Sequence, residues 1–207
     1  MNIQKSLSDC LWDYRLMSVV IEPSKNNNPH GVVSCGDINE STCKRIINEH
    51  KNPNNLSVVG KVQRNDGYVT DTKIRDVDAW IIREDADWIN DLIVNTTHTA
   101  LEHLNYEVVG LLERPQLLRY NSPSSGYRWH TDIGQKDSSI RKISISINLN
   151  DSYDGGSLLF FSDNIFKLKM HRGMTVAFPS FLSHKVMPIT KGTRWSLVAW
   201  ISGHPFR

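Results

Sequence analysis

Residues 141–150 read Arg141-Lys142-Ile143-Ser144-Ile145-Ser146-Ile147-Asn148-Leu149-Asn150. Large aliphatic residues alternate strictly with small polar residues in this stretch. Because successive side chains of a β-strand point to opposite faces, the alternation predicts a strand with one apolar face against a core and one polar face. A helix would require apolar residues every three or four positions instead.

Short apolar runs separated by turn residues continue on both sides of this strand, from Asn105 onward. No helical pattern lies between them, and parallel strands would need long crossover connections. The sequence therefore predicts a mainly β fold, an antiparallel sandwich or barrel supported by two earlier helices. The other predicted strands of this part are Glu107–Leu112, Gln116–Tyr120, Gly156–Phe161, Gly173–Phe178 and Thr193–Ile201.

The two supporting helices are predicted in the first half of the chain. Asp37, with Glu40 three residues later, is typical of a helix N-terminus. Apolar residues at i, i+3 and i+4 spacing between Trp88 and Leu104 predict a longer amphipathic helix, and a short strand is expected just before it at Val77–Ile81.

The segment Lys51–Lys73 is rich in Asn, Asp and Gly and shows little periodicity. These features predict a long, mobile loop that would serve as a lid over a site.

Length and charge restrict the class of protein. A chain of 207 residues fits one domain, 1–207. The chain contains 24 Lys and Arg residues against 22 Asp and Glu residues, and it has no run of basic residues. We therefore expect no nucleic-acid partner. No apolar stretch is long enough to span a bilayer, so we expect no membrane association. The first residues lack a secretory pattern, and the three cysteines show no CxxC spacing, which favours the cytoplasm.

One pattern points to metal chemistry. In His130-Thr131-Asp132 the imidazole and the carboxylate lie two residues apart, on the same side of an extended chain. His184 follows after several predicted strands, which could bring it back beside this pair. Two His and one Asp are the ligands of a facial iron triad with open coordination positions. Arg194 and Ser196 share one face of a later strand, and a buried guanidinium there needs an anionic partner such as a carboxylate.

The ordered set of these residues resembles the 2-oxoglutarate and Fe(II)-dependent dioxygenases, and most of all the prolyl 4-hydroxylase-like branch. The resemblance covers roughly Val33 to Gly203, which we take as the core of a single dioxygenase domain. The residues that carry it are Tyr120, Gly126, Tyr127, His130, Asp132, the segment Tyr153–Leu158, Gly173 through Ser180, His184 and Arg194, with Ile74, Arg75, Asp76 and Trp80 upstream.

The resemblance implies a double-stranded β-helix, or jelly roll. It implies that His130, Asp132 and His184 bind Fe(II) and form the catalytic centre. It also implies that Arg194 pairs with the distal carboxylate of 2-oxoglutarate, with Tyr120 and Ser196 as further cosubstrate ligands. Ascorbate is a further cofactor to consider. We expect the substrate to meet Tyr127 and Trp129, at the entrance, and also Arg75.

The implied activity is hydroxylation of a residue in a peptide or protein, with prolyl as the favoured side chain. An oxygenase acting on a free amino acid or small metabolite is the first alternative. A jelly-roll binding module without turnover is the second. A nucleic-acid demethylase of the same superfamily is disfavoured, because Trp200 stands six residues beyond Arg194 where a second Arg would be expected. The oligomeric state is left open.

Overall fold

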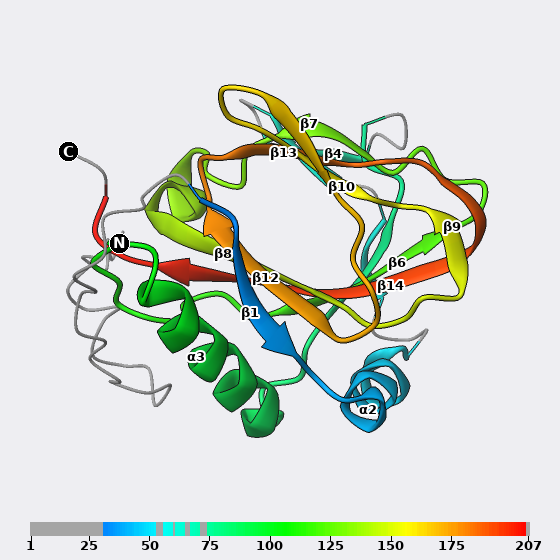
Figure 1. The fold of residues 1–207 in the computed structure, drawn as a ribbon, viewed down its shortest axis with the longest axis horizontal. Coiled ribbons are helices and arrows are strands. Elements are labelled where there is room, and N and C mark those ends of the chain that lie inside the picture. The colour runs from blue at the N-terminus through cyan, green and yellow to red at the C-terminus, as the bar shows by residue number, and fades with distance from the viewer. Residues whose placement is uncertain (1–30, 53–55, 60, 65–66, 71–73, 206–207) are drawn as a thin grey trace, which may run out of the picture.

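The structure of the protein is a computed structural model. It describes residues 31–52, 56–59, 61–64, 67–70 and 74–205, and between 56 and 70 it describes the backbone alone. Figure 1 shows two antiparallel sheets that face each other, with helices α2 (Glu40–His50) and α3 (Asp87–Leu101) outside the larger one. This arrangement is a jelly roll, as the resemblance implied.

The larger sheet has the order β1-β12-β8-β14-β6-β5-β2, with β9 paired to β14. Every neighbouring pair is antiparallel, and β8 lies between β12 and β14. The strand bounds are β1 Val33–Asp37, β2 Leu56–Val59, β5 Asp78–Ile81, β6 Gln116–Asn121, β8 Arg141–Asn148, β9 Tyr153–Gly155, β12 Met174–Pro179 and β14 Ile189–Ser202.

The smaller sheet has the order β11-β10-β13-β7, also antiparallel. Its strands are β7 Tyr127–His130, β10 Leu158–Phe161, β11 Ile165–Leu168 and β13 Ser183–Val186. A separate hairpin is formed by β3 (Lys61–Arg64) and β4 (Gly67–Thr70), and a short 3-10 helix, η2 (Lys136–Ile140), precedes β8.

Strand β8 explains how the two faces of the larger sheet are used. Its apolar residues Ile143, Ile145 and Ile147 are buried in a core that also contains Ile89 and Ile93 of α3. Its alternate residues are buried as well, because the smaller sheet covers the other face; they are Ser144, Ser146 and Asn148. The polar face of β8 therefore points into the space between the sheets, where polar side chains can serve a site.

Several predicted elements are confirmed. The structure contains both helices, the strand before α3, and the strands that correspond to β6, β8, β10, β12 and β14. The helix start was predicted two residues too early. The N-cap of α2 is Asn39, whose side chain accepts a hydrogen bond from the Thr42 amide at 2.8 Å, while Asp37 ends β1.

Two predictions about strands and loops are wrong. Glu107–Leu112 is not a strand, because only Gly110 bridges to Ser202 and its φ of +146° leaves the extended region. Lys51–Lys73 is not an unpatterned loop, because β2, β3 and β4 lie within it. Strands β3 and β4 pair with each other along their whole length, with Arg64 opposite Gly67. Residues 53–55, 60, 65–66 and 71–73 of this segment lie outside the described part.

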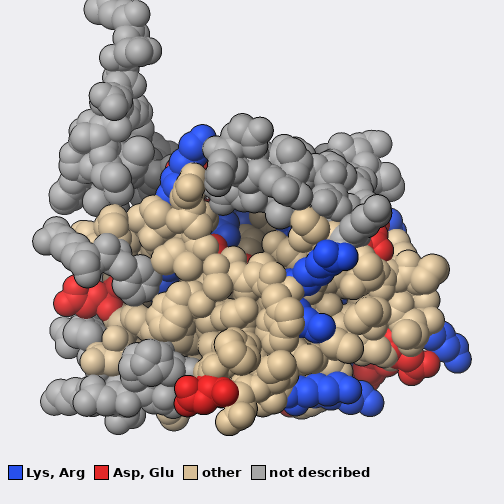
Figure 2. Space-filling view, turned by 90° about the horizontal axis from the view of Figure 1, so that it is seen from above, with Lys and Arg blue, Asp and Glu red and all other residues tan. Residues whose placement is uncertain are grey.

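Surface features agree with the near-neutral charge. On the face that Figure 2 shows, the Lys and Arg side chains lie apart from one another among tan residues, and the surface is hollowed beside the grey ones. Within the described residues, no helix combines the length and the apolar character that a membrane crossing requires.

Candidate metal centre and cosubstrate pocket

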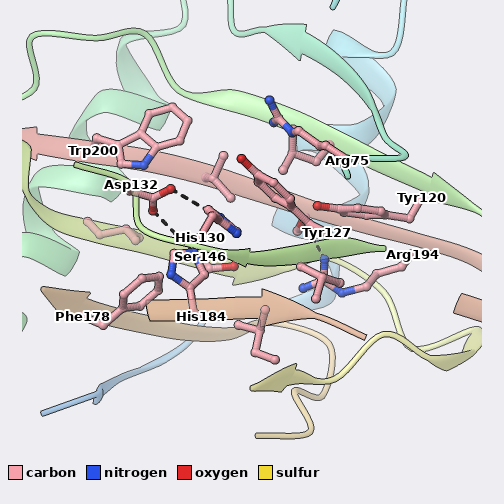
Figure 3. A pocket seen from close by; sticks show the side chains of 16 residues that line it. Arg75, Tyr120, Tyr127, His130, Asp132, Ser146, Phe178, His184, Arg194 and Trp200 are labelled. Atoms are coloured by element: carbon pink, nitrogen blue, oxygen red, sulfur yellow. Dashed lines mark hydrogen bonds and ion pairs between the residues drawn. The ribbon is translucent and has the colours of Figure 1, made fainter. Parts of the chain in front are cut away.

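The smaller sheet brings the three predicted metal ligands together. Strands β7 and β13 are neighbours, and His130 is directly paired with His184 in their register. Asp132 follows β7 and is held by a hydrogen bond from its amide to the Ser180 carbonyl, 2.8 Å long. The ligand atoms of the three side chains all lie within 4.8 Å of one another. Figure 3 shows them converging on one point.

Main-chain carbonyls orient both imidazoles. His130 Nδ1 lies 2.7 Å from the Arg128 carbonyl oxygen, and His184 Nδ1 lies 2.9 Å from that of Leu182. A carbonyl oxygen can only accept, so each Nδ1 carries the hydrogen and each Nε2 keeps its lone pair. The two Nε2 atoms lie 3.7 Å from the two carboxylate oxygens of Asp132. All three side chains therefore present metal-binding lone pairs to the same space.

The electrostatics of this cluster favour the protonation states that a metal requires. Burial alone would raise the pKa of the Asp132 carboxyl, but His184, His130 and a hydrogen bond from Ser144 lower it below its ordinary value. Burial, and next to it the proximity of His184, lowers the pKa of His130. A carboxylate beside a neutral imidazole is the deprotonated donor set that binds divalent cations.

Arg194 lies in the same pocket and is 2% exposed. Its Nη1 donates to Ser196 Oγ at 3.1 Å, and its Cζ lies 5.5 Å from the ring centroid of Tyr120. Its buried Nε has no hydrogen-bond partner, and no ion pair joins Arg194 to a carboxylate in the part of the chain that the structure describes. A buried guanidinium of this kind is suited to an external anion, because its fork matches a carboxylate in bidentate geometry.

Sixteen residues from both sheets line the pocket (Figure 3). Figure 3 places Arg194 and Tyr120 toward one end and Trp200 and Phe178 beyond the His-Asp-His group at the other. The same pocket therefore connects the His-Asp-His group to the guanidinium of Arg194. Of the predicted site residues, those in the lining are Arg75, Tyr120, Tyr127, His130, Asp132, His184, Arg194 and Ser196.

Tyr127 connects the metal group to Arg75. Its ring stacks on the imidazole of His130 with centroids 3.5 Å apart and an interplanar angle of 16°. Arg75 is bridged to Tyr127 through the backbone, and its Cζ lies 5.3 Å from the ring centroid. Burial raises the pKa of Tyr127 to about 12, so its hydroxyl stays protonated and can act as a donor in the pocket.

Trp129 and Trp200 differ from the expectation. Trp129, expected at the entrance, is 40% exposed, is not part of the pocket lining, and contacts Phe161 and Lys185 instead. Trp200, which was not among the predicted site residues, lines the pocket. The sequence indicates this position of Trp200, because it lies an even number of residues from Arg194 and Ser196 on β14. Its side chain therefore faces the same side of the sheet.

Comparison with known proteins agrees with this geometry. Residues 115–202, which carry all three candidate metal ligands and Arg194, match the model of the 2OG-Fe(II) oxygenase superfamily. The chain is similar to this superfamily over that part, which is less than half of its 207 residues. It is similar to PKHD-type hydroxylases of Synechococcus sp. (strain CC9605), at 30% identity over 92 residues, and of Hyphomonas neptunium, at 33% over 96 residues. These matches span only 42% of this chain and 41% and 42% of the two relatives.

Solved structures extend the similarity to most of the fold of this chain. A prolyl-4-hydroxylase from Pseudomonas putida superposes with a TM-score of 0.63 at 19% identity, over 84% of this chain and 94% of that one. A prolyl hydroxylase from Trichoplax adhaerens, in complex with a peptide fragment of the hypoxia inducible factor oxygen degradation domain, gives 0.67 at 18%, over 85% and 84%. At these identities the similarity concerns the fold, which is prolyl 4-hydroxylase-like.

The superfamily implies Fe(II) and 2-oxoglutarate, and the residues present fit both groups. Two imidazole nitrogens and one carboxylate oxygen are the donors of a facial triad, and Fe(II) is bound by such sets. The unpartnered Nε of buried Arg194 fits the distal carboxylate of a dicarboxylic acid.

Proposed function

We propose that this chain is an Fe(II)- and 2-oxoglutarate-dependent dioxygenase that hydroxylates a peptidyl residue, with prolyl as the favoured side chain. The observation that carries the proposal is one pocket that contains both a His-Asp-His group and a buried Arg that pairs with no carboxylate among the described residues. A generic metal site would need the first feature only. A structural arginine would have an internal anionic partner.

In this proposal His130, Asp132 and His184 hold the Fe(II), and Arg194 binds the distal carboxylate of 2-oxoglutarate. Ser196 keeps the guanidinium in place through its hydrogen bond, and the Tyr120 hydroxyl faces the cosubstrate. When bound, the metal and cosubstrate supply oxidation of a C–H bond by O2, with release of CO2 and succinate. Ascorbate belongs to the proposal as a reductant of the iron.

The substrate is assigned to the end of the pocket opposite Arg194. There Trp200 and Phe178 supply flat apolar walls (Figure 3). Arg75 and Tyr127 lie nearer to Tyr120, and in this proposal Arg75 donates a hydrogen bond to a peptide carbonyl. Aromatic walls with few polar groups suit a pyrrolidine ring, which has no side-chain donor or acceptor. Similarity to a prolyl hydroxylase solved with a peptide fragment supports a peptidyl substrate.

We also infer that one dioxygenase domain accounts for residues 1–207, with its core at 33–203. Both sheets, both described helices and all the proposed site residues fall within this core. Each of the two hydrophobic clusters contains residues of the larger sheet, one cluster on each face. The larger sheet therefore connects both clusters within one unit.

The test is a mass gain of one oxygen on proline-containing peptides incubated with the protein, Fe(II), 2-oxoglutarate and ascorbate in air. We expect oxidation on proline, and none with His184→Ala. Succinate formation together with oxidation of a free amino acid, and of no peptide, would instead support the small-molecule oxygenase. No succinate with any substrate would support the binding module.

A further inference from the structure

Arg141, the first residue of β8, links the metal group to the pocket wall without lining the pocket itself. Its Nη1 donates to the main-chain carbonyl of Asp132 at 3.0 Å. Its Nε and Nη2 both donate to the carboxylate of Glu113. Its Cζ lies 4.0 Å from the ring centroid of Trp200. One guanidinium therefore contacts a candidate metal ligand, an anchoring carboxylate and a residue of the pocket lining.

These contacts fix the guanidinium in three ways. The pair with Glu113 uses two parallel N–H groups, which sets the plane of the fork. The Trp200 ring lies against that plane, as in a cation–π contact. The Arg141 side chain is only 15% exposed, so solvent weakens these contacts less than it would at the surface. The third edge of the fork is then aimed at the Asp132 carbonyl.

The Asp132 backbone is held from both sides as a result. Its amide donates to the Ser180 carbonyl at 2.8 Å, and its carbonyl accepts from Arg141 at 3.0 Å. Asp132 lies beyond the end of β7, so no strand pairing holds it. The two hydrogen bonds take the place of that pairing and set the direction in which the carboxylate leaves the chain.

We propose that Arg141 is a positioning residue that aims Asp132 at the metal and holds Trp200 against the substrate end of the pocket. The inference rests on the proposed function, because it takes the His-Asp-His group as a metal centre. Lys cannot replace Arg141, because an ammonium has neither the planar fork nor the flat face. Loss of such outer contacts typically lowers metal affinity by about 10- to 100-fold.

Arg119 supplies a matched control. It donates twice to Asp78, and its Cζ lies 5.1 Å from the ring centroid of Trp80, so it has the same kinds of contact. It contacts no candidate metal ligand among the described hydrogen bonds and is not in the pocket lining. Variants of Arg119 therefore report what loss of an Arg–carboxylate–Trp cluster does to stability alone.

The experiment is a Co(II) titration without 2-oxoglutarate, with urea unfolding of each variant. We compare the wild type with Arg141→Lys, Arg141→Ala, Glu113→Gln, Arg119→Lys and Arg119→Ala. The Arg141 variants should bind Co(II) about 10- to 100-fold more weakly and change the visible absorption of the bound ion. Glu113→Gln keeps the shape of the cluster. It should also weaken Co(II) binding and change the visible absorption of the bound ion in the same direction. The Arg119 variants should keep the wild-type Co(II) dissociation constant.

Wild-type Co(II) affinity and spectrum in the Arg141 variants would overturn the inference, and any loss of stability would then show a purely structural ion pair. If Arg141→Ala does not fold, Arg141→Lys and Glu113→Gln decide the question. Failure of the wild type to bind Co(II) at all is a different result, because it contradicts the proposed metal centre itself.

Discussion

At the scale of single residues, the pocket separates two tasks between its ends. His130, Asp132 and His184 form the candidate metal-binding group. Arg194 is suited to bind an anion, because its Nε has no hydrogen-bond partner in the described structure. Because no hydrogen bond or ion pair joins these two groups in the described structure, loss of Arg194 should leave metal binding largely intact. Two predictions follow from this separation.

Asp132→Ala removes the only carboxylate of the triad. We expect it to abolish turnover of 2-oxoglutarate and to reduce Co(II) affinity, because the two neutral imidazoles that remain do not offset the charge of the cation. The fold should survive, because both hydrogen bonds that anchor residue 132 use its backbone. Decarboxylation of 2-oxoglutarate and Co(II) titration are the measurements.

Asp137→Ala is the control for this variant. Asp137 is an exposed acidic residue five positions away, in η2, and its removal changes the net charge equally. It should behave as the wild type in both assays. Near-normal turnover in Asp132→Ala would eliminate the metal assignment.

Arg194→Ala should weaken 2-oxoglutarate binding and leave Co(II) binding nearly unchanged. A charge-assisted bidentate contact in a desolvated site contributes about 2–5 kcal/mol. At about 1.4 kcal/mol per decade, that is a loss of roughly 30-fold to several thousand-fold in affinity. Titration of 2-oxoglutarate into the Mn(II)-loaded variant measures the change directly.

Arg194→Lys tests whether the fork or only the charge matters. Lys keeps the positive charge but offers a single ammonium, so its affinity for 2-oxoglutarate should lie between those of Ala and the wild type. An unchanged dissociation constant in Arg194→Ala would mean that the cosubstrate binds elsewhere.

At the scale of elements, the centre depends on the close pairing of β7 with β13. Gly126, directly before β7, has a φ of +75°, and a Cβ there would press against the carbonyl oxygens of Val186 and Met187, the latter at 2.8 Å. Gly126→Ala should therefore push β7 away from β13 and disturb the Tyr127–His130 stack. Strain and steric overlap of this kind each cost about 1–3 kcal/mol.

Gly36→Ala isolates the steric part of this cost. Gly36 has a similar φ of +86°, but nothing lies within 4 Å of a Cβ built on it. We expect Gly126→Ala to lower the free energy of unfolding, measured in urea, by at least about 1 kcal/mol more than Gly36→Ala. Equal losses would show that the β7–β13 approach is not tight.

The elements that the sequence predicts well are those whose two faces differ. Strand β8 alternates between aliphatic and small polar residues, because one face meets the helices and the other meets the space between the sheets. Helix α3 has its apolar residues on one side for the same reason. In both elements, the spacing of the apolar residues follows from which side of the element is buried against other apolar residues.

The elements that escaped prediction have weak or misleading local patterns. Strands β7 and β13 have four residues each, too few for a period, and they contain the imidazoles that the site needs. The sequence nevertheless predicts the same candidate site, because ligand spacing and family resemblance do not depend on strand boundaries. Arg141 and Glu113 carry no sequence signal, because only the fold brings residues 28 positions apart into contact.

At the scale of the whole molecule, the pocket lies between two sheets that are packed from opposite sides. One hydrophobic cluster lies between the larger sheet and the helices and joins them. The second hydrophobic cluster lies between the two sheets and joins them around the pocket. Ligands bound between the sheets should therefore stabilise the complete fold rather than one strand.

Mn(II) and 2-oxoglutarate together, without O2, should raise the unfolding temperature. At 100 times the dissociation constant a ligand adds about 2.7 kcal/mol. For a chain of this size that corresponds to a rise of roughly 5–10 °C in thermal unfolding followed by circular dichroism. His184→Ala should show little or no rise under the same conditions, and a rise equal to that of the wild type would place the metal elsewhere.

The most direct test of the account is succinate formation from 2-oxoglutarate by the wild type, His184→Ala and Arg194→Ala, with and without Fe(II). We expect succinate from the wild type only when Fe(II) and O2 are both present. We expect none above background from His184→Ala, and formation from Arg194→Ala only at much higher 2-oxoglutarate concentrations. Wild-type succinate no greater than the His184→Ala background, across a panel of proline-containing peptides, would contradict the account.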